Sequence, residues 1–215
     1  MIISRGRRYI FVHIPKTGGT ALGLALEARA MADDILVGDT PKARARAGRL
    51  DGLATAGRLW KHSTMADIDG LLTCAELEQL LVFTLVRNPW DRLVSLYHWL
   101  KDQSFTHPMV ATAKAADFSG FLNHATTLAS VHAAPFGSYL RHPSVNPGLF
   151  IRIEHFAPDA APLAAHLGFA LAPLPVINSS NRRRDWRGYY TDRDATLVAA
   201  LCAEDIARFD YRFDP

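Results

Sequence analysis

The sequence predicts an α/β fold of three layers, in which helices cover both faces of a central parallel sheet. Short apolar runs rich in β-branched and aromatic residues alternate with stretches of helical periodicity, an order typical of parallel sheets. Two of these runs end in a turn that leads directly into a helix. The 215 residues suffice for one large core, and no repeat or linker divides them, so we expect a single domain over residues 1–215.

The first expected unit is a strand over residues 8–14, followed by a glycine-bearing turn and a helix. The turn after Pro15 contains a lysine, two threonines and two glycines: Lys16, Thr17, Gly18, Gly19 and Thr20. A strand-to-helix turn gathers backbone N–H groups and the positive end of a helix dipole, which favours an anion. A glycine pair alone would indicate only a tight turn, but the lysine and hydroxyls beside it favour an anion site.

The second expected unit follows a variable region over residues 33–58. Thr73 and Glu76 form a capping-box pattern for a short helix. Residues 80–86 are almost continuously apolar, as in a strand buried on both faces. Asn88 is a good helix N-cap before a proline, so a long helix begins there.

The C-terminal part predicts a late strand over residues 149–153 and a helix over residues 162–167. A loop rich in Asn, Ser and Arg covers residues 173–188, and Thr191 caps a final helix that runs to Phe209. These elements complete the alternation of strands and helices.

A second anion site is predicted where the buried strand ends at Arg87. On the following helix Asn88, Arg92 and Ser95 share one face by their spacing, so a guanidinium and a hydroxyl face the sheet edge where ligands bind. The alternative is an ion pair between Arg87 and Asp91, with Ser95 facing solvent. We interpret Asp91 and Arg92 as structural, and Arg87 with Ser95 as a phosphate site.

Composition and motifs exclude several classes of protein. The net charge is +3 with no long Lys/Arg tract, so we expect no nucleic-acid partner. No apolar stretch has the length of a membrane span and no signal peptide is visible, so we expect a cytoplasmic chain without an integral membrane segment. The nine histidines and two cysteines form no metal motif. In the turn the lysine precedes the glycines, unlike in the Walker loop of P-loop NTPases.

Two segments resemble motifs of the sulfotransferases that use 3′-phosphoadenosine 5′-phosphosulfate (PAPS). Residues 11–22, FVHIPKTGGTAL, resemble the 5′-phosphosulfate loop, most closely that of carbohydrate sulfotransferases and their bacterial relatives. Residues 83–97, FTLVRNPWDRLVSLY, resemble the 3′-phosphate motif, and IRIEHF, LPVINSS and DIARFDYRF resemble the C-terminal pattern. The resemblance covers most of the chain and is weakest over residues 33–58 and 106–147.

The resemblance implies a P-loop-like sulfotransferase fold with PAPS as donor and PAP as product. It assigns residues 16–20 to the 5′-phosphosulfate and Arg87 and Ser95 to the 3′-phosphate. It also assigns Ser179 and Arg183, in a loop that closes over the nucleotide. The partner is a hydroxyl-bearing acceptor: sugar, lipid, phenol and small-metabolite hydroxyls all stay open. The sequence does not indicate the oligomeric state.

Sulfuryl transfer places the attacking and leaving oxygens roughly in line, and Lys16 can stabilise charge on the bridging oxygen. The acceptor hydroxyl needs a base. His62 is the first candidate, because a similarly placed histidine serves some carbohydrate members of the family and an imidazole suits general-base work. Its alternative role is that of an ordinary loop histidine. We expect His13 to be buried on the first strand and Glu154 to be the weaker candidate.

Two other functions stay open. A P-loop kinase-like phosphotransferase would turn over ATP with magnesium. A non-catalytic nucleotide-binding protein would bind adenosine bisphosphate and transfer nothing.

Overall fold

The structure is a computed structural model that describes residues 1–145, 148–171, 174, 182–183 and 185–214. Contacts divide the chain into two compact units, each made of two stretches of sequence. The first unit contains residues 1–86 and 136–177, and the second contains residues 87–135 and 178–215. The single domain expected from the sequence stays a prediction.

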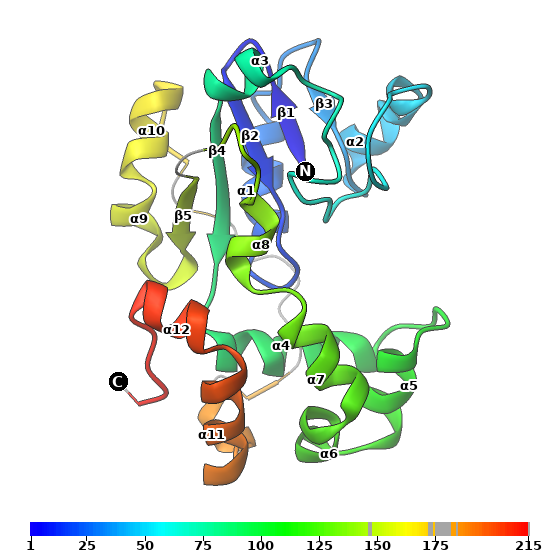
Figure 1. Cartoon of the computed structure of the whole chain (residues 1–215), viewed down its shortest axis with the longest axis vertical. Coiled ribbons are helices and arrows are strands. Elements are labelled where there is room, and N and C mark those ends of the chain that lie inside the picture. Colours follow the sequence, from blue (N-terminus) through cyan, green and yellow to red (C-terminus); the bar gives the residue numbers. More distant parts are fainter. Residues whose placement is uncertain (146–147, 172–173, 175–181, 184, 215) are drawn as a thin grey trace. The chain divides into compact units, whose positions relative to one another are not determined.

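A five-stranded mixed sheet forms the centre of the first unit (Figure 1). The strand order is β3-β1-β2-β4-β5. The bounds are β1 Ile2–Ser4, β2 Tyr9–Val12, β3 Ile35–Leu36, β4 Leu81–Val86 and β5 Leu149–Arg152. β2, β4 and β5 pair in parallel, whereas β1 pairs antiparallel with both β2 and β3. The α/β class is therefore confirmed, and the prediction of a parallel sheet is wrong for the β3-β1 edge.

The short connection between β1 and β2 explains why these strands pair antiparallel. Only four residues connect Ser4 to Tyr9, and a parallel neighbour would need a crossover of a dozen residues or more. Arg8 has a φ of 54°, and its N–H donates to the Arg5 carbonyl at 3.2 Å, which closes the turn. The chain therefore folds back as a hairpin.

Both faces of this sheet are buried, because successive side chains of a strand point to opposite faces. On one face Phe11 and Phe83 pack with apolar side chains that include Leu22 of α1 (Gly19–Glu27) and Leu163 of α10 (Ala161–Leu167). On the other face Ile10 and Val82 pack with a second set: Met65, Leu77 of α3 (Cys74–Glu78) and Leu140 of α8 (Phe136–Leu140). The sheet thus lies between two hydrophobic clusters.

Shorter elements complete the first unit. They are α2 (Pro41–Ala45), η1 (Ala47–Leu50), η2 (Ile153–His155) and α9 (Phe156–Asp159). Within residues 33–58, read as a variable region, the structure thus contains β3, α2 and η1. Figure 1 shows α9 and α10 next to β5.

The second unit is helical. Its elements are α4 (Pro89–Lys101), α5 (Pro108–Ala115), α6 (Phe118–Asn123), α7 (Ala125–His132), η3 (Arg187–Tyr189), α11 (Asp192–Leu201) and α12 (Ala203–Phe209). Tyr97 of α4 packs on the rings of Phe118 and Phe121 at centroid distances of 5.5 and 5.3 Å. The single C-terminal helix expected from the sequence is two helices, because Cys202 leaves the helical conformation at φ −109° and ψ 24°.

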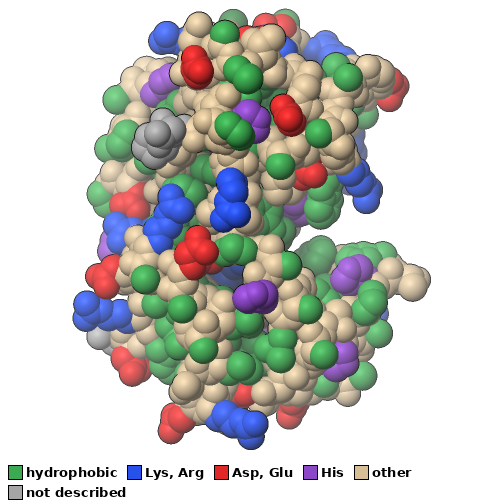
Figure 2. Space-filling view, in the orientation of Figure 1, with side chains coloured by type: hydrophobic (Ala, Val, Ile, Leu, Met, Phe, Trp, Pro, Cys, Tyr) green, Lys and Arg blue, Asp and Glu red, His purple; other side chains and the backbone are tan. Residues whose placement is uncertain are grey.

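In the described part of the chain, every helix is too short or too polar to span a bilayer. On the face drawn in Figure 2, Lys and Arg side chains lie interspersed with Asp and Glu side chains.

Candidate anion-binding turns

The turn between β2 and α1 presents an open helix N-terminus. Gly18 stands at the N-cap position with φ 88°, and a glycine has no side chain that could cap the helix start. Lys16 also adopts a left-handed conformation, with φ 67°. The first N–H groups of a helix have no carbonyl partner within that helix. The turn therefore offers backbone donors, a dipole end and a lysine at one place, as the sequence predicts.

Close packing sets the shape of this turn. A Cβ atom on Gly18 would lie 2.2 Å from Cδ1 of Ile153, and one on Gly19 would lie 2.2 Å from Cδ2 of His13. Thr17 is fully buried, and its hydroxyl donates to the Ile14 carbonyl at 2.9 Å. This hydrogen bond from the Thr17 hydroxyl stabilises the turn.

Two histidines adjoin the turn. The rings of His13 and His62 meet edge to face, with centroids 4.7 Å apart, and Nδ1 of His62 lies 2.7 Å from the His13 carbonyl oxygen. Burial lowers the pKa of His62 to about 4, although the hydrogen bond to that carbonyl raises it. Burial also lowers the pKa of His13 well below its usual value. Both imidazoles are therefore neutral at pH 7.

His13 corrects the sequence interpretation, because β2 ends at Val12 and the ring of His13 lies against Gly19 rather than inside the strand. Glu154 lies exposed in η2.

A small pocket, here called the α1 pocket, begins at this turn. It runs along α1 past Gly19, Thr20, Gly23 and Glu27, and His13 also lines it. Segment 37–40 and Lys61 line it as well. Nothing in the sequence pattern marks this pocket, since its walls come from separate segments.

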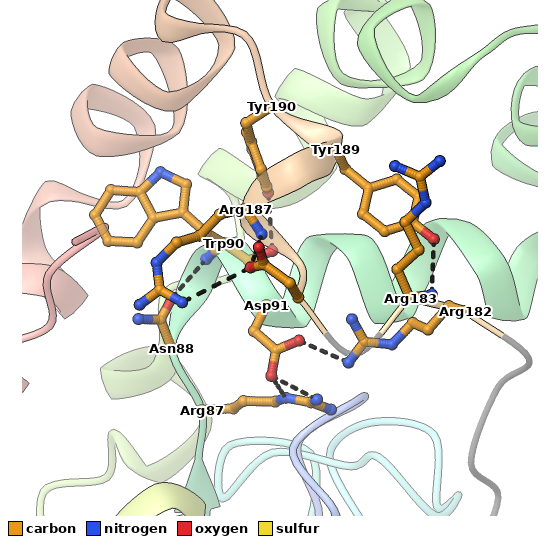
Figure 3. Close-up of polar contacts among 10 residues, drawn as sticks. Arg87, Asn88, Trp90, Asp91, Arg182, Arg183, Arg187, Tyr189 and Tyr190 are labelled. Atoms are coloured by element: carbon orange, nitrogen blue, oxygen red, sulfur yellow. Dashed lines mark hydrogen bonds and ion pairs between the residues drawn. The ribbon is translucent and has the colours of Figure 1, made fainter. Parts of the chain in front are cut away.

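The second turn lies at Arg87, between β4 and α4, and ion pairs stabilise it. Asn88 caps α4 by accepting from the Trp90 N–H at 3.1 Å, with Pro89 at the first helical position, as predicted. Asp91 accepts from Nε and Nη2 of Arg87 at 2.8 and 2.6 Å, and from Nη2 of Arg182 at 2.6 Å (Figure 3). The side chains of Arg87, Asp91 and Arg182 are 19, 14 and 13% exposed. One carboxylate thus joins two largely buried guanidinium groups.

Arg182 lies at this turn, although the sequence analysis did not select it. The sequence interpretation selected its neighbour Arg183, whose side chain is exposed and whose N–H donates to the Tyr189 hydroxyl at 3.2 Å. Nη1 of Arg182 is buried without a hydrogen-bond partner among the described residues. The run of three arginines at 182–184 was the available signal. Of the alternative given for this turn, the ion pair between Arg87 and Asp91 is present, but Ser95 is buried and does not face solvent. Ser179 lies outside the described residues.

The C-terminal segment holds the start of α4. The Asn88 amide donates to the Arg212 carbonyl at 3.0 Å, and the Tyr190 hydroxyl donates to the Trp90 carbonyl at 2.8 Å. Nε of Arg187 donates to the Phe213 carbonyl at 2.7 Å. Figure 3 shows Tyr190 and Arg187 beside the first turn of α4.

No protein-family model matches the sequence, and no curated protein matches it. Among solved structures, the chain is similar to the crystal structure of the mouse sulfotransferase SULT7A1 complexed with PAP. The identity is 18% and the TM-score is 0.50, and the match covers 97% of this chain and 87% of that one. At this identity the likeness shows the fold: the chain has a sulfotransferase fold.

Proposed function

We propose that this chain, with its sulfotransferase fold, transfers the sulfuryl group of PAPS to an acceptor hydroxyl. The observation that carries the proposal is the turn between β2 and α1, where Lys16 precedes an uncapped helix start. Its support from outside the chain is the likeness to a sulfotransferase that was crystallised with PAP. The three-layer, P-loop-like form of the fold belongs to this proposal.

Each of the two turns has its own assignment in this proposal. Backbone N–H groups of residues 17–20 bind the 5′-phosphosulfate, and Lys16 neutralises the bridging oxygen. Arg87 and Ser95 bind the 3′-phosphate, since a planar guanidinium suits a phosphate. Ser179 and Arg183 stay assigned to the nucleotide by resemblance. We add Arg182, because its guanidinium shares a carboxylate with Arg87.

The transfer step balances simply. The acceptor oxygen forms a bond to sulfur, the bond between sulfur and the bridging oxygen breaks, and its electron pair stays on PAP. The hydroxyl proton passes to an imidazole, for which we propose His62. The low pKa of His62 keeps its ring unprotonated at neutral pH. His13 is the competing base, because its ring lies against both His62 and Gly19. A carbohydrate acceptor and a cytoplasmic location are further parts of the proposal.

The decisive experiment replaces Lys16 by alanine and uses Lys114→Ala, an exposed lysine of α5, as the matched control. Transfer of label from PAPS to an acceptor panel is read by mass, and PAP affinity by calorimetry. Loss of the charge that stabilises the leaving group should lower turnover about 100-fold or more, while PAP affinity changes only a few-fold. Undiminished turnover would show that Lys16 has no catalytic role.

The 3′-phosphate assignment has its own test. Arg87→Ala should weaken PAP binding by about 1.5–3 kcal/mol, because a charge-assisted hydrogen bond is lost. Binding of AMP, which lacks the 3′-phosphate, should not change. An equal loss for both nucleotides would contradict the assignment.

The same assays separate the alternatives. Magnesium-dependent turnover of ATP without use of PAPS would favour a kinase-like phosphotransferase. Binding of PAP with no transfer to any acceptor would favour a nucleotide-binding protein.

A further inference from the structure

The α1 pocket has the geometry of a groove that starts at the proposed sulfuryl site. Gly19, Gly23 and Glu27 recur every four residues, so they share one face of α1. The two glycines carry no side chain that would fill the groove. Glu27 lies eight positions after Gly19, about 12 Å along a helix. A ligand of that length could have one end at the turn and the other at Glu27.

The far end of the pocket holds a buried carboxylate. Glu27 is 6% exposed, and the hydroxyl of Thr40 lies 2.9 and 2.7 Å from its two oxygens. Nζ of Lys42 donates to the main-chain carbonyl of Glu27 and not to the carboxylate. Among the described residues, neither a lysine nor an arginine forms an ion pair with it. A buried carboxylate has about four acceptor positions, so one hydroxyl leaves most of them open.

The other charged groups of the pocket do not compensate Glu27. Lys61 is paired with Asp39 at 2.6 Å. Burial lowers the pKa of the Met1 amino group to about 5 and that of His13 well below its usual value, so both are neutral at pH 7. Among the described residues, Thr40 is therefore the hydrogen-bond partner of the Glu27 carboxylate, while Lys42 bonds to the main-chain carbonyl of the same residue. An acidic ligand would add a second negative charge there, whereas an ammonium group would pair with the carboxylate.

We propose that the α1 pocket binds the acceptor, and that this acceptor is an alcohol bearing a cationic amine, such as an amino sugar or an amino alcohol. This inference rests on the proposed function and specifies its acceptor. The hydroxyl lies near His13 at the Gly19 end, so this inference favours His13 over His62 as its base, and the ammonium group bonds to Glu27. The neutral imidazole of His13 can accept a hydrogen bond from that hydroxyl.

The test compares acceptors that differ only in the charge of the amine. The chitosan disaccharide is paired with its N,N′-diacetyl form, and 8-aminooctanol with its N-acetyl form, using labelled PAPS. The wild type should favour the amines by about tenfold in kcat/KM, the factor of one charge-assisted contact. Glu27→Gln keeps a partner for Thr40 and should bring that ratio near one, with PAP affinity unchanged. Glu78→Gln, at an exposed glutamate of α3, is the matched control.

A second variant, Gly23→Ala, tests the same pocket in case Glu27→Gln does not fold. A Cβ on Gly23 would lie 3.8 Å from the nearest atom, Cε1 of Phe11, which is ordinary contact. Gly23→Ala should therefore keep or raise the melting temperature, because alanine favours the helix. It should still lower kcat/KM for the amines several-fold, since its methyl group enters the pocket.

Each outcome decides the inference. A preference for the N-acetyl forms, or an amine preference that survives Glu27→Gln, would overturn it. If PAP binds but no probe is sulfated, the same pairs are titrated into the PAP complex, and amines that bind no tighter than their acetylated forms would overturn it. Failure to bind PAP would refute the proposed function instead, and titration of the pairs into the free protein would still test the pocket.

Discussion

The two turns proposed to bind anions are stabilised by different forces. The turn of residues 16–20 has few charges and is fixed by close contacts around Gly18 and Gly19. The turn at Arg87 is fixed by hydrogen bonds between one carboxylate and two guanidinium groups. Close packing around a turn does not change with salt concentration or with an added anion. The stability of buried ion pairs changes with both. An anionic ligand should therefore rescue damage at the second turn and not at the first.

The largest effect is expected for Gly18→Ala. The new methyl group would meet Ile153 at 2.2 Å, and the residue would keep φ at 88°. Left-handed strain and overpacking together should lower the free energy of unfolding by about 4 kcal/mol. PAP binding should be lost, and added PAP should not restore the melting temperature.

Gly168→Ala is the matched control for that variant. Gly168 has φ 74°, and a Cβ there meets nothing within 4 Å. Gly168→Ala should lower the free energy of unfolding only by the strain of the left-handed backbone, about 1–2 kcal/mol. If both variants lost the same stability in thermal unfolding, contact with Ile153 would not shape the turn.

A smaller effect is expected for Asp91→Asn. This change leaves Arg87 and Arg182 without the carboxylate that joins them, and it should lower the free energy of unfolding by about 3 kcal/mol. PAP should raise the melting temperature more in this variant than in the wild type, because the 3′-phosphate supplies the missing negative charge. Calorimetric scans with and without PAP measure the difference.

Asp102→Asn, at the exposed C-cap of α4, is the control for Asp91→Asn and should behave as the wild type. A PAP-induced shift that is equal in Asp91→Asn and the wild type would contradict the assignment of the second turn to a phosphate.

The smallest effect is an acid dependence of stability near the first turn. In the unfolded chain His62 takes up a proton near pH 6.5, but in the folded protein it does so only near pH 4. Between these values the unfolded state binds more protons, so stability is complete above pH 6.5 and is lost as the pH falls toward 4. The loss is on the order of 2 kcal/mol, and His62→Gln should reduce it.

His132→Gln, at an exposed histidine of α7, should leave the acid dependence unchanged. Denaturant titrations at several pH values compare the variants. A wild type equally stable at pH 4.5 and pH 7 would rule out a buried neutral His62.

The sequence predicted those parts of both turns that depend on local patterns. The apolar run before Arg87 is β4, and Asn88 and Pro89 begin α4, because caps and buried strands are encoded by neighbouring residues. Lys16 lies between β2 and α1, as its position after an apolar strand indicated.

Other features depend on contacts between distant segments. β1 has only three residues, too few to show a period, and its direction follows from the length of the turn after it. The ion pair between Arg182 and Asp91 joins residues far apart in the chain, and no repeat in the sequence encodes it. The proximity of His13 and His62 likewise joins segments far apart in the chain.

The backbone of Lys16 has a consequence for evolution and design. A lysine at φ 67° adopts a conformation that costs roughly 1–2 kcal/mol and that asparagine or glycine tolerates better. A search for more thermostable variants should therefore tend to replace Lys16, and each such gain in robustness would remove the ammonium group on which the proposed chemistry depends. Selection for heat resistance and selection for turnover would act in opposite directions at this position.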